Sequence, residues 1–271
     1  MEAGYEEKLQ SLRDRKVFEL IPCSEVSKDR KIRHGHPVFT LKRDENGKPT
    51  RYKVRIVFKG YEQVYGRDYT MTTLPTAWME MHRVLLGTAA THSWDAQQVD
   101  VKTAFLHGIL SEEETQYMEQ MEGYRKPGKE NWIWKITHSL YGMKQAGRVW
   151  NKTLDAQMEK WGFKHLECES CVYYRKTEHG TVIVSVHVDD FLSISDKKEK
   201  NDRFLDDMEK VWKISRLRTP KHLVGMGITW DHPNKIVKLS QTALIDKIIA
   251  QFGQCDVTPL SILIDQGLKL R

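Results

Sequence analysis

The chain has 271 residues, which is enough to bury a substantial hydrophobic core in one large domain or two closely packed ones. Its 43 lysines and arginines exceed its 37 aspartates and glutamates, a mild basic excess that suits a polyanionic partner and many ordinary enzymes alike. No signal peptide and no run of about 18 apolar residues occurs, so secretion and membrane spanning are disfavoured and an intracellular, cytoplasmic protein is expected.

The four cysteines do not form a recognisable framework. Cys168 and Cys171 have C-x-x-C spacing with His165 three residues before them, but no second pair completes a tetrahedral zinc site. Cys23 and Cys255 lie far away in the sequence, in agreement with a reducing compartment. We expect the C-x-x-C pair to be structural.

The first elements are an N-terminal lead-in over residues 1–30, with a surface helix at residues 5–13, and then a β-hairpin over residues 38–58. Asn46-Gly47 suits its tight turn, because both residues accept positive φ.

Alternation in the second strand of this hairpin separates two kinds of side chain. Lys53 and Arg55 fall on one face, and Val54, Ile56 and Phe58 fall on the other. The hairpin would therefore present a rigid basic surface, although a solvated strand face is the more ordinary reading of two cations.

Helical periodicity marks three later segments. Apolar residues recur at Met81, Val84, Leu85, Ala89 and Trp94, and again at Trp150, Leu154, Met158 and Trp161. A charged helix is expected from Asp196 to Arg203, continuing through Phe204, Leu205, Met208 and Val211.

Strands are expected at residues 97–101, 172–174, 182–188 and 191–195. No linker rich in Pro, Gly or Ser divides the chain, and no repeat occurs. The irregular order of strands and helices predicts an α+β fold built on an antiparallel sheet packed on helices.

Asp189-Asp190 lies between two strongly apolar strands, and Asp100 is the single carboxylate of another. An Asp-Asp pair at a turn is usually turn chemistry alone. If the fold also brought Asp100 to this turn, the three charges would repel unless a divalent cation lay among them, and Mg²⁺ prefers such oxygen ligands. No G-x-S-x-G elbow, Walker A loop or H-E-x-x-H helix competes with this interpretation.

Four motifs together resemble the Ty1/copia-type retrotransposon reverse transcriptases over nearly the whole chain. They are K-V-R-I-V-F-K-G-Y-E-Q at residues 53–63 with G-R-D-Y at 66–69, Q-V-D-V-K-T-A-F-L-H-G at 98–108, S-L-Y-G-M-K-Q-A at 139–146, and V-D-D at 188–190.

The resemblance implies a right-hand polymerase fold with fingers and palm over residues 31–258, ending at the start of a truncated thumb whose first helix would be Asp246 to Phe252. The palm motifs would span residues 97–108, 139–150, 182–195 and 223–230. Residues 259–271 would be a truncated tail, with no RNase H domain.

The resemblance also implies an RNA-directed DNA polymerase that takes an RNA template, a DNA primer and dNTPs. Asp100, Asp189 and Asp190 would be its catalytic metal ligands, holding two Mg²⁺ ions, for which Mn²⁺ could substitute. Oligomeric state is not implied.

Nucleotide and primer contacts follow from the same resemblance. Lys53 and Arg55 would contact the dNTP phosphates, Phe105 the sugar and Gln145 the nucleotide, while Gly225, Met226 and Gly227 would form the primer grip. From the residues alone, a core side chain is the preferred interpretation of Phe105. Leu140, Met143 and Trp150 are assigned to packing, and the helix at 150–161 would join the hairpin as one wall of a nucleic-acid groove.

Three positions depart from the family pattern. His187 replaces Tyr, Gly147 replaces Pro and is expected to loosen a turn, and L-P-T-A-W at 74–78 replaces A-P-V-A-R. Two functions stay open: an active polymerase, or a degenerate fragment that binds nucleic acid without catalysis. A host interaction protein has no positive feature in the sequence.

Overall fold

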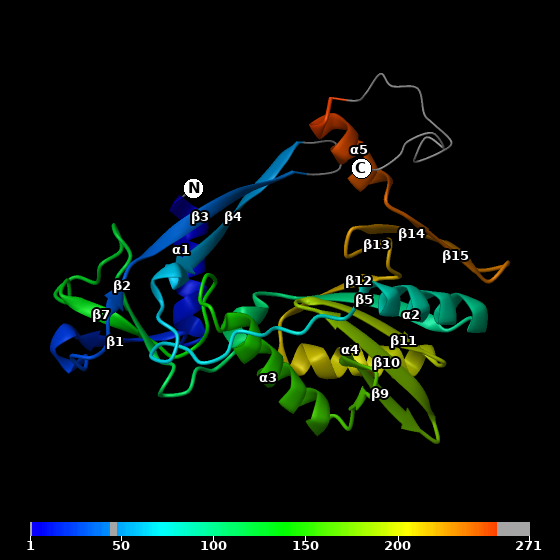
Figure 1. Cartoon of the computed structure of the whole chain (residues 1–271), viewed down its shortest axis with the longest axis horizontal. Coiled ribbons are helices and arrows are strands. Elements are labelled where there is room, and N and C mark those ends of the chain that lie inside the picture. The colour runs from blue at the N-terminus through cyan, green and yellow to red at the C-terminus, as the bar shows by residue number, and fades with distance from the viewer. Residues whose placement is uncertain (1, 44–47, 254–271) are drawn as a thin grey trace, which may run out of the picture.

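The computed structural model describes residues 2–43 and 48–253. The predicted Asn46-Gly47 turn, Cys255 and the tail at 259–271 lie outside the described residues. The fold mixes helices with sheets, as the sequence predicts, and Figure 1 shows two lobes from which two arms rise on the same side. No helix in the described part of the chain is long and apolar enough to cross a membrane.

The first lobe is built around a four-stranded sheet with the strand order β1-β7-β6-β2. These strands are β1 (Phe18–Pro22), β2 (Ile32–Arg33), β6 (Gln116–Glu119) and β7 (Trp132–Ile136). Short 3-10 turns at Cys23–Glu25, Gly60–Glu62 and Ala104–His107 connect the elements of the chain.

The hairpin pairs β3 (Gly35–Arg43) with β4 (Pro49–Phe58) and forms the first arm. The predicted alternation is confirmed, since Val54, Ile56 and Phe58 are buried. Helix α1 (Glu2–Asp14) covers this face: its Tyr5, Leu9 and Leu12 belong to the same core. The described part of the N-terminal lead-in is thus packed into the lobe.

The second lobe contains a six-stranded antiparallel sheet with the order β12-β5-β11-β10-β9-β8. Its strands are β5 (Asp95–Val101), β8 (Lys164–Leu166), β9 (Glu169–Thr177), β10 (Gly180–His187), β11 (Asp190–Ser195) and β12 (Ile214–Arg218).

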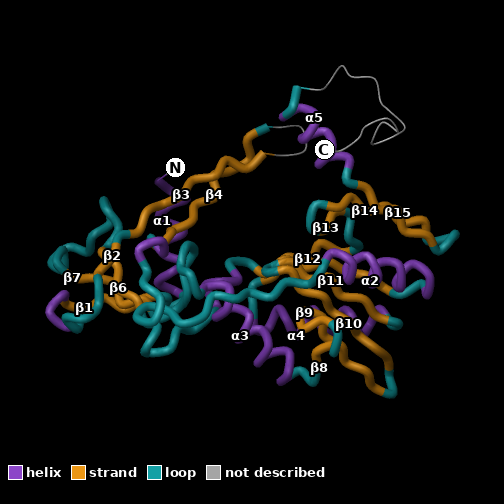
Figure 2. The backbone as a smooth tube through the Cα atoms, viewed as in Figure 1, coloured by secondary structure: helices purple, strands orange, loops and turns teal. Residues whose placement is uncertain are grey.

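Helices cover both faces of this sheet (Figure 2). α3 (Ala146–Lys160) and α4 (Lys198–Val211) share one core with alternate residues of β5, β10 and β11. α2 (Met79–His92) packs on the opposite face. Alternation along the strands therefore supplies two separate apolar layers.

Two apolar residues of the periodic patterns are exposed. Val84 on α2 is 57% exposed and Val211 at the end of α4 is 44% exposed. The core contact of α2 comes instead from Leu85, Leu86 and Ala89. Because the apolar stripe of a helix is broad, periodicity identifies the helix better than it fixes the edge of its buried face.

The second arm begins with a three-stranded sheet of β13 (His222–Leu223), β14 (Met226–Asp231) and β15 (Ile236–Ser240). Its Leu223 and Ile228 pack in the α2 core. α5 (Thr242–Gln251) follows, beginning four residues before the predicted first thumb helix, and exposes apolar side chains at Leu244, Ile245, Ile248 and Ile249.

Candidate active site

The three aspartates meet at one end of the six-stranded sheet. Asp190 opens β11 directly opposite Asp100 on β5, and cross-strand partners have Cβ atoms roughly 4.5–5.5 Å apart. Asp189 lies in the two-residue turn between His187 and Asp190, and its carbonyl accepts the Val101 N–H at 2.9 Å. Sheet pairing thus brings together carboxylates that are far apart in sequence.

The turn that carries Asp189 is held in an unfavourable backbone conformation. Val188 has a φ of +63°, which a β-branched residue rarely adopts. The buried Trp150 indole donates its Nε1–H to the Val188 carbonyl at 2.8 Å. The sequence assigned Trp150 to packing alone, but its side chain also fixes this turn. A buried indole N–H needs a hydrogen-bond acceptor, and this need was the sequence signal that could have predicted the second role.

Negative charge is crowded at this end of the sheet. Burial, followed by the charges of Asp189 and Asp100, raises the pKa of the Asp190 carboxyl. Burial also raises the pKa of Asp189, with the Asp100 charge adding to the effect and Lys53 opposing it. A cation placed among these carboxylates would relieve both the burial cost and the repulsion.

The donor set fits a hard divalent cation, because it consists of carboxylate oxygens that require a counter-charge. The side chains are not already closed around an ion: no group of three His, Cys, Asp or Glu among residues 2–43 and 48–253 is arranged as a metal site. Asp100 instead accepts a hydrogen bond from Lys102 Nζ at 2.5 Å. Lys102 contacts one of the two carboxylate oxygens of Asp100.

Cations of the hairpin face the aspartates. Burial lowers the pKa of Lys53, and so does the neighbouring Arg55, while Asp100 and Asp189 raise it. Lys8 of α1, which the sequence did not single out, joins this group: burial, then the charges of Arg15, Lys53 and Arg55, lower its pKa to about 8. The cations of the hairpin and α1 therefore lie on one side of this site, opposite the three aspartates.

Tyr141 links the hairpin to the aspartates, and its role was also missed from the sequence. The Arg55 guanidinium lies 5.7 Å from the centre of its ring. Burial raises the pKa of the Tyr141 hydroxyl, and Asp189 and Asp100 add to the effect. Gly142 allows this placement, because a Cβ on it would lie 2.2 Å from the Phe58 carbonyl oxygen.

Phe105 lies beside Tyr141 at the same site. It is only partly buried, and the two rings meet edge to face with their centroids 5.4 Å apart. Its backbone carbonyl accepts a hydrogen bond from Ser139. The Phe105 side chain is therefore partly accessible at the site and is held in place by its contact with Tyr141.

Gln145 is placed differently from what a nucleotide contact requires. Its side chain is fully buried, where Oε1 accepts from Gln63 at 3.0 Å and Nε2 donates to the Asp68 carbonyl at 3.3 Å. Gln145 therefore joins the segment after β4 to the start of α3.

Gly225 lies in the turn from β13 to β14, and Met226 and Gly227 are the first two residues of β14. Gly225 has a φ of +79°, and Met226 is buried. The small sheet packs in the α2 core, on the side of the six-stranded sheet away from α3 and α4. No hydrogen bond in the described part of the chain joins these three residues to the aspartates.

Two of the positions that depart from the family pattern have neighbours that account for the residue found there. The His187 ring meets the His82 ring edge to face, with ring centroids 6.2 Å apart. Gly147 lies in the first turn of α3, where a Cβ would meet Leu74 Cδ2 at 2.8 Å. Gly147 therefore does not lie in a loosened turn, as we expected, but in a helix that Leu74 approaches closely.

The cysteines are free thiols in the described chain, and Cys168 is exposed whereas Cys171 is buried. Burial, with the charge of Glu169, raises the pKa of Cys171 to about 11.

Comparison with known proteins gives one consistent family. Residues 15–265 match the family described as reverse transcriptase (RNA-dependent DNA polymerase). The chain is 33% identical over 266 residues to the retrovirus-related Pol polyprotein from transposon TNT 1-94 of Nicotiana tabacum, covering 98% of this chain and 20% of that protein. It is 32% identical over 233 residues to the Pol polyprotein from transposon RE1 of Arabidopsis thaliana, covering 86% and 16%.

A solved structure of the foamy viral protease-reverse transcriptase in complex with double-stranded DNA resembles 95% of this chain and 37% of that one, with a TM-score of 0.48 and 12% identity. The chain spans about a fifth of the length of the tobacco relative and less of the Arabidopsis one. The chain belongs to the reverse transcriptase family, as the reverse transcriptase domain of a Ty1/copia-type retrotransposon Pol polyprotein.

Proposed function

We propose that this chain is an RNA-directed DNA polymerase that adds dNTPs to a primer 3′-hydroxyl on an RNA template. The observation that carries the proposal is the convergence of Asp100, Asp189 and Asp190 at one end of a buried sheet, facing Lys53. In this proposal the six-stranded sheet is the palm, the β3–β4 hairpin belongs to the fingers, and β13–β15 with α5 begin the thumb.

Asp100, Asp189 and Asp190 would hold divalent metal, with Mg²⁺ as the expected ion and Mn²⁺ as a substitute. When bound, two such ions would activate the 3′-hydroxyl and stabilise the attacking and leaving oxygens of the phosphoryl transfer. The protein's part is to keep the carboxylates fixed, and the Trp150 and Val101 hydrogen bonds to the turn do this.

The neighbouring side chains would receive the incoming nucleotide. Lys53 and Arg55 would bind its phosphates, and the mutual repulsion of these cations with Lys8 favours an anion between them. Phe105, braced by Tyr141, would lie against the sugar. Gln145 would act by holding the walls of this site together.

Nucleic acid would lie along a basic groove beside α3. A cavity of about 730 Å³ separates the 66–70 segment from α3, and its walls include the cations Arg30, Arg67, Arg148 and Lys152 with Glu113 and Glu114. Arg148, Arg30 and Arg67 are paired with Glu114, Asp29 and Asp68, so Lys152 is the cation of this set that has no ion-pair partner in the described part of the chain. Binding should therefore weaken steeply with salt. Gly225, Met226 and Gly227 would hold the primer end.

Primer extension on a primed RNA homopolymer tests the proposal directly. We expect extension that needs Mg²⁺ or Mn²⁺ and that falls below detection in Asp189→Ala/Asp190→Ala. Removing two repelling carboxylates should not unfold the sheet. The matched control, Glu178→Gln/Asp231→Asn, changes two remote surface carboxylates and should extend normally.

The alternative is a degenerate domain that binds nucleic acid without catalysis, and the basic side chains beside α3 would suffice for such binding. Salt-sensitive binding of an RNA/DNA hybrid by the unmodified chain, with no extension in either metal, would establish this alternative and end the polymerase proposal.

A further inference from the structure

A second basic cavity lies at the far end of the six-stranded sheet. It has a volume of about 410 Å³, within the roughly 300–1,000 Å³ range of ligand pockets. Its walls come from β9, β10 and α4. The residues lining it are Arg175, Thr177, Gly180, Val182, Lys200, Arg203, Asp207 and Lys210.

Strand pairing and helix periodicity direct these side chains to one place. Arg175 on β9 pairs with Val182 on β10, whose side chain lies in the core under α4. Thr177 follows Arg175 by two residues and so shares its face of the sheet. The four α4 residues are spaced three, four and three apart, which places them on one side of the helix.

Positive charge in this cavity is not balanced. Its one carboxylate, Asp207, already binds Lys210 at 2.8 Å. Arg175, Lys200 and Arg203 have no carboxylate at ion-pair distance in the described part of the chain. Asp196 lies near Gly180, where its carboxylate accepts the Thr181 N–H at 2.8 Å, and does not line the cavity.

Arg175 is held in place before any ligand arrives. One guanidinium nitrogen donates to the Trp161 carbonyl at 2.8 Å, and the group stacks over Phe163 with its carbon 4.6 Å from the ring centre. Burial lowers the pKa of Arg175, and repulsion from Arg203 adds to this effect while Asp207 opposes it. A fixed guanidinium loses little freedom when it binds an anion.

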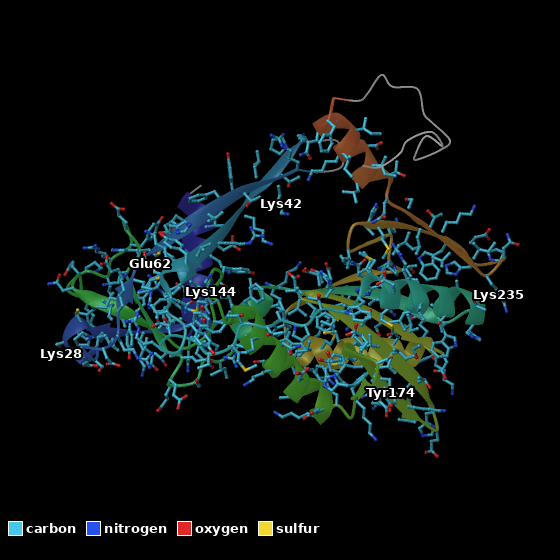
Figure 3. All side chains as sticks on the ribbon, in the orientation of Figure 1. Lys28, Lys42, Glu62, Lys144, Tyr174 and Lys235 are labelled. Atoms are coloured by element: carbon cyan, nitrogen blue, oxygen red, sulfur yellow. The ribbon has the colours of Figure 1, made fainter. Side chains whose placement is uncertain are left out.

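The cavity is separate from the proposed polymerase site. The catalytic turn follows the C-terminal end of β10, whereas Val182 and Gly180 lie near its beginning, about 17 Å and about 24 Å before His187 at roughly 3.4 Å per residue. Figure 3 shows Tyr174, the neighbour of Arg175, low on the second lobe and well apart from Lys42 on the hairpin. A nucleotide at the aspartates could not reach this cavity.

We propose that this cavity binds a phosphate group, carried by a nucleic acid strand or by a small phosphate compound. Three unbalanced cations suit phosphate better than a carboxylate, because phosphate offers more negative charge and more acceptor oxygens to share. Arginine adds paired donors that match phosphate geometry. The proposal goes beyond the polymerase function and does not require it.

The test compares the unmodified chain with Lys200→Ala/Arg203→Ala and with a control, Lys176→Ala/Lys197→Ala. The control removes the same charge from the same region, but neither of its residues lines the cavity. Inorganic phosphate is titrated at constant ionic strength while the melting temperature is recorded. We expect phosphate to stabilise the unmodified chain and the control, and to stabilise the cavity variant much less.

Binding of a labelled single-stranded RNA of about 12 nucleotides identifies the source of the phosphate. A loss of roughly tenfold or more in the cavity variant relative to the control would show that a strand is bound there. Unchanged RNA binding, with phosphate stabilisation lost, would point to a small phosphate compound.

Equal stabilisation by phosphate in all three proteins, or none in the unmodified chain, would overturn the proposal. Misfolding is distinguished from loss of the site, because removing repelling cations should leave the melting temperature without phosphate unchanged or higher. Asp189→Ala/Asp190→Ala should keep the phosphate effect, so the outcome does not depend on polymerase activity.

Discussion

At the scale of single residues, the catalytic turn shows how one hydrogen bond can stabilise a costly conformation. Val188 has a positive φ that costs on the order of 1–3 kcal/mol for such a residue, and its carbonyl is fixed by the Trp150 indole. The turn also carries Asp189. Any shift of the Val188 peptide would move this carboxylate, and small displacements of reacting groups are expensive in rate.

Trp150→Phe removes this hydrogen bond while keeping an aromatic ring. We expect kcat for primer extension to fall by about tenfold to hundredfold, because the turn loses its anchor, while the KM for dNTP changes little. Trp161→Phe is the control, since the Trp161 indole forms no hydrogen bond in the described part of the chain.

Val188→Gly provides the decisive comparison for Trp150, because glycine adopts positive φ without strain. If Trp150 acts by holding the strained turn, the loss caused by Trp150→Phe should shrink in the Val188→Gly background. An equal loss in both backgrounds would show that Trp150 acts only through packing.

At the scale of elements, α3 and the segment before α2 pack closely because the large Leu74 side chain lies against Gly147, which has no side chain. Leu74 fills the space that a side chain at position 147 would occupy, with Leu74 Cβ 2.9 Å from a Cβ built on Gly147. Both residues depart from the family pattern. One departure therefore makes room for the other.

Gly147→Ala tests this close packing through thermal or denaturant unfolding. In the natural background the overlap with Leu74 should destabilise the fold by on the order of 1 kcal/mol, despite the better helix propensity of alanine. In a Leu74→Ala background the overlap disappears, and Gly147→Ala should become stabilising by up to about 1 kcal/mol. Destabilisation of the same size in both backgrounds would contradict this close packing.

At the scale of the whole molecule, the buried His82 and the half-buried His107 make stability depend on pH. Burial lowers the pKa of His82 to about 4, with the charge of His187 contributing, and burial lowers that of His107 to about 4, with Arg15 contributing. The unfolded value is near 6.5, so folding favours the neutral form. Their contribution is present above pH 6.5 and is lost as pH falls toward 4.

In His82→Gln, the free energy of unfolding should fall less steeply as the pH drops from about 6.5 toward 4. Each such histidine steepens the fall of unfolding free energy by at most about 1.4 kcal/mol per pH unit between pH 6.5 and 4. Urea unfolding across this range should show a smaller histidine-dependent slope in the variant, with His107 and His138, whose pKa values burial also lowers, supplying the remainder. A slope identical to that of the unmodified chain would mean that His82 is charged in the folded state.

The sequence by itself determined the elements and their chemistry. Period-two alternation identified β4 and the strands around Asp189-Asp190, helical spacing identified α2, α3 and α4, and the motifs identified the family. These signals are local, because each depends on residues within one strand or helix.

Only the tertiary structure decided which residues share a site. Asp100 and Asp190 are partners because β5 pairs with β11, and Tyr141 lies between Arg55 and the aspartates because Gly142 packs closely on β4. Gln145 is buried and Trp150 is a hydrogen-bond donor for the same reason: partners distant in sequence surround them. Contacts of that kind leave no periodic trace along the chain, so they had to be read from the folded molecule.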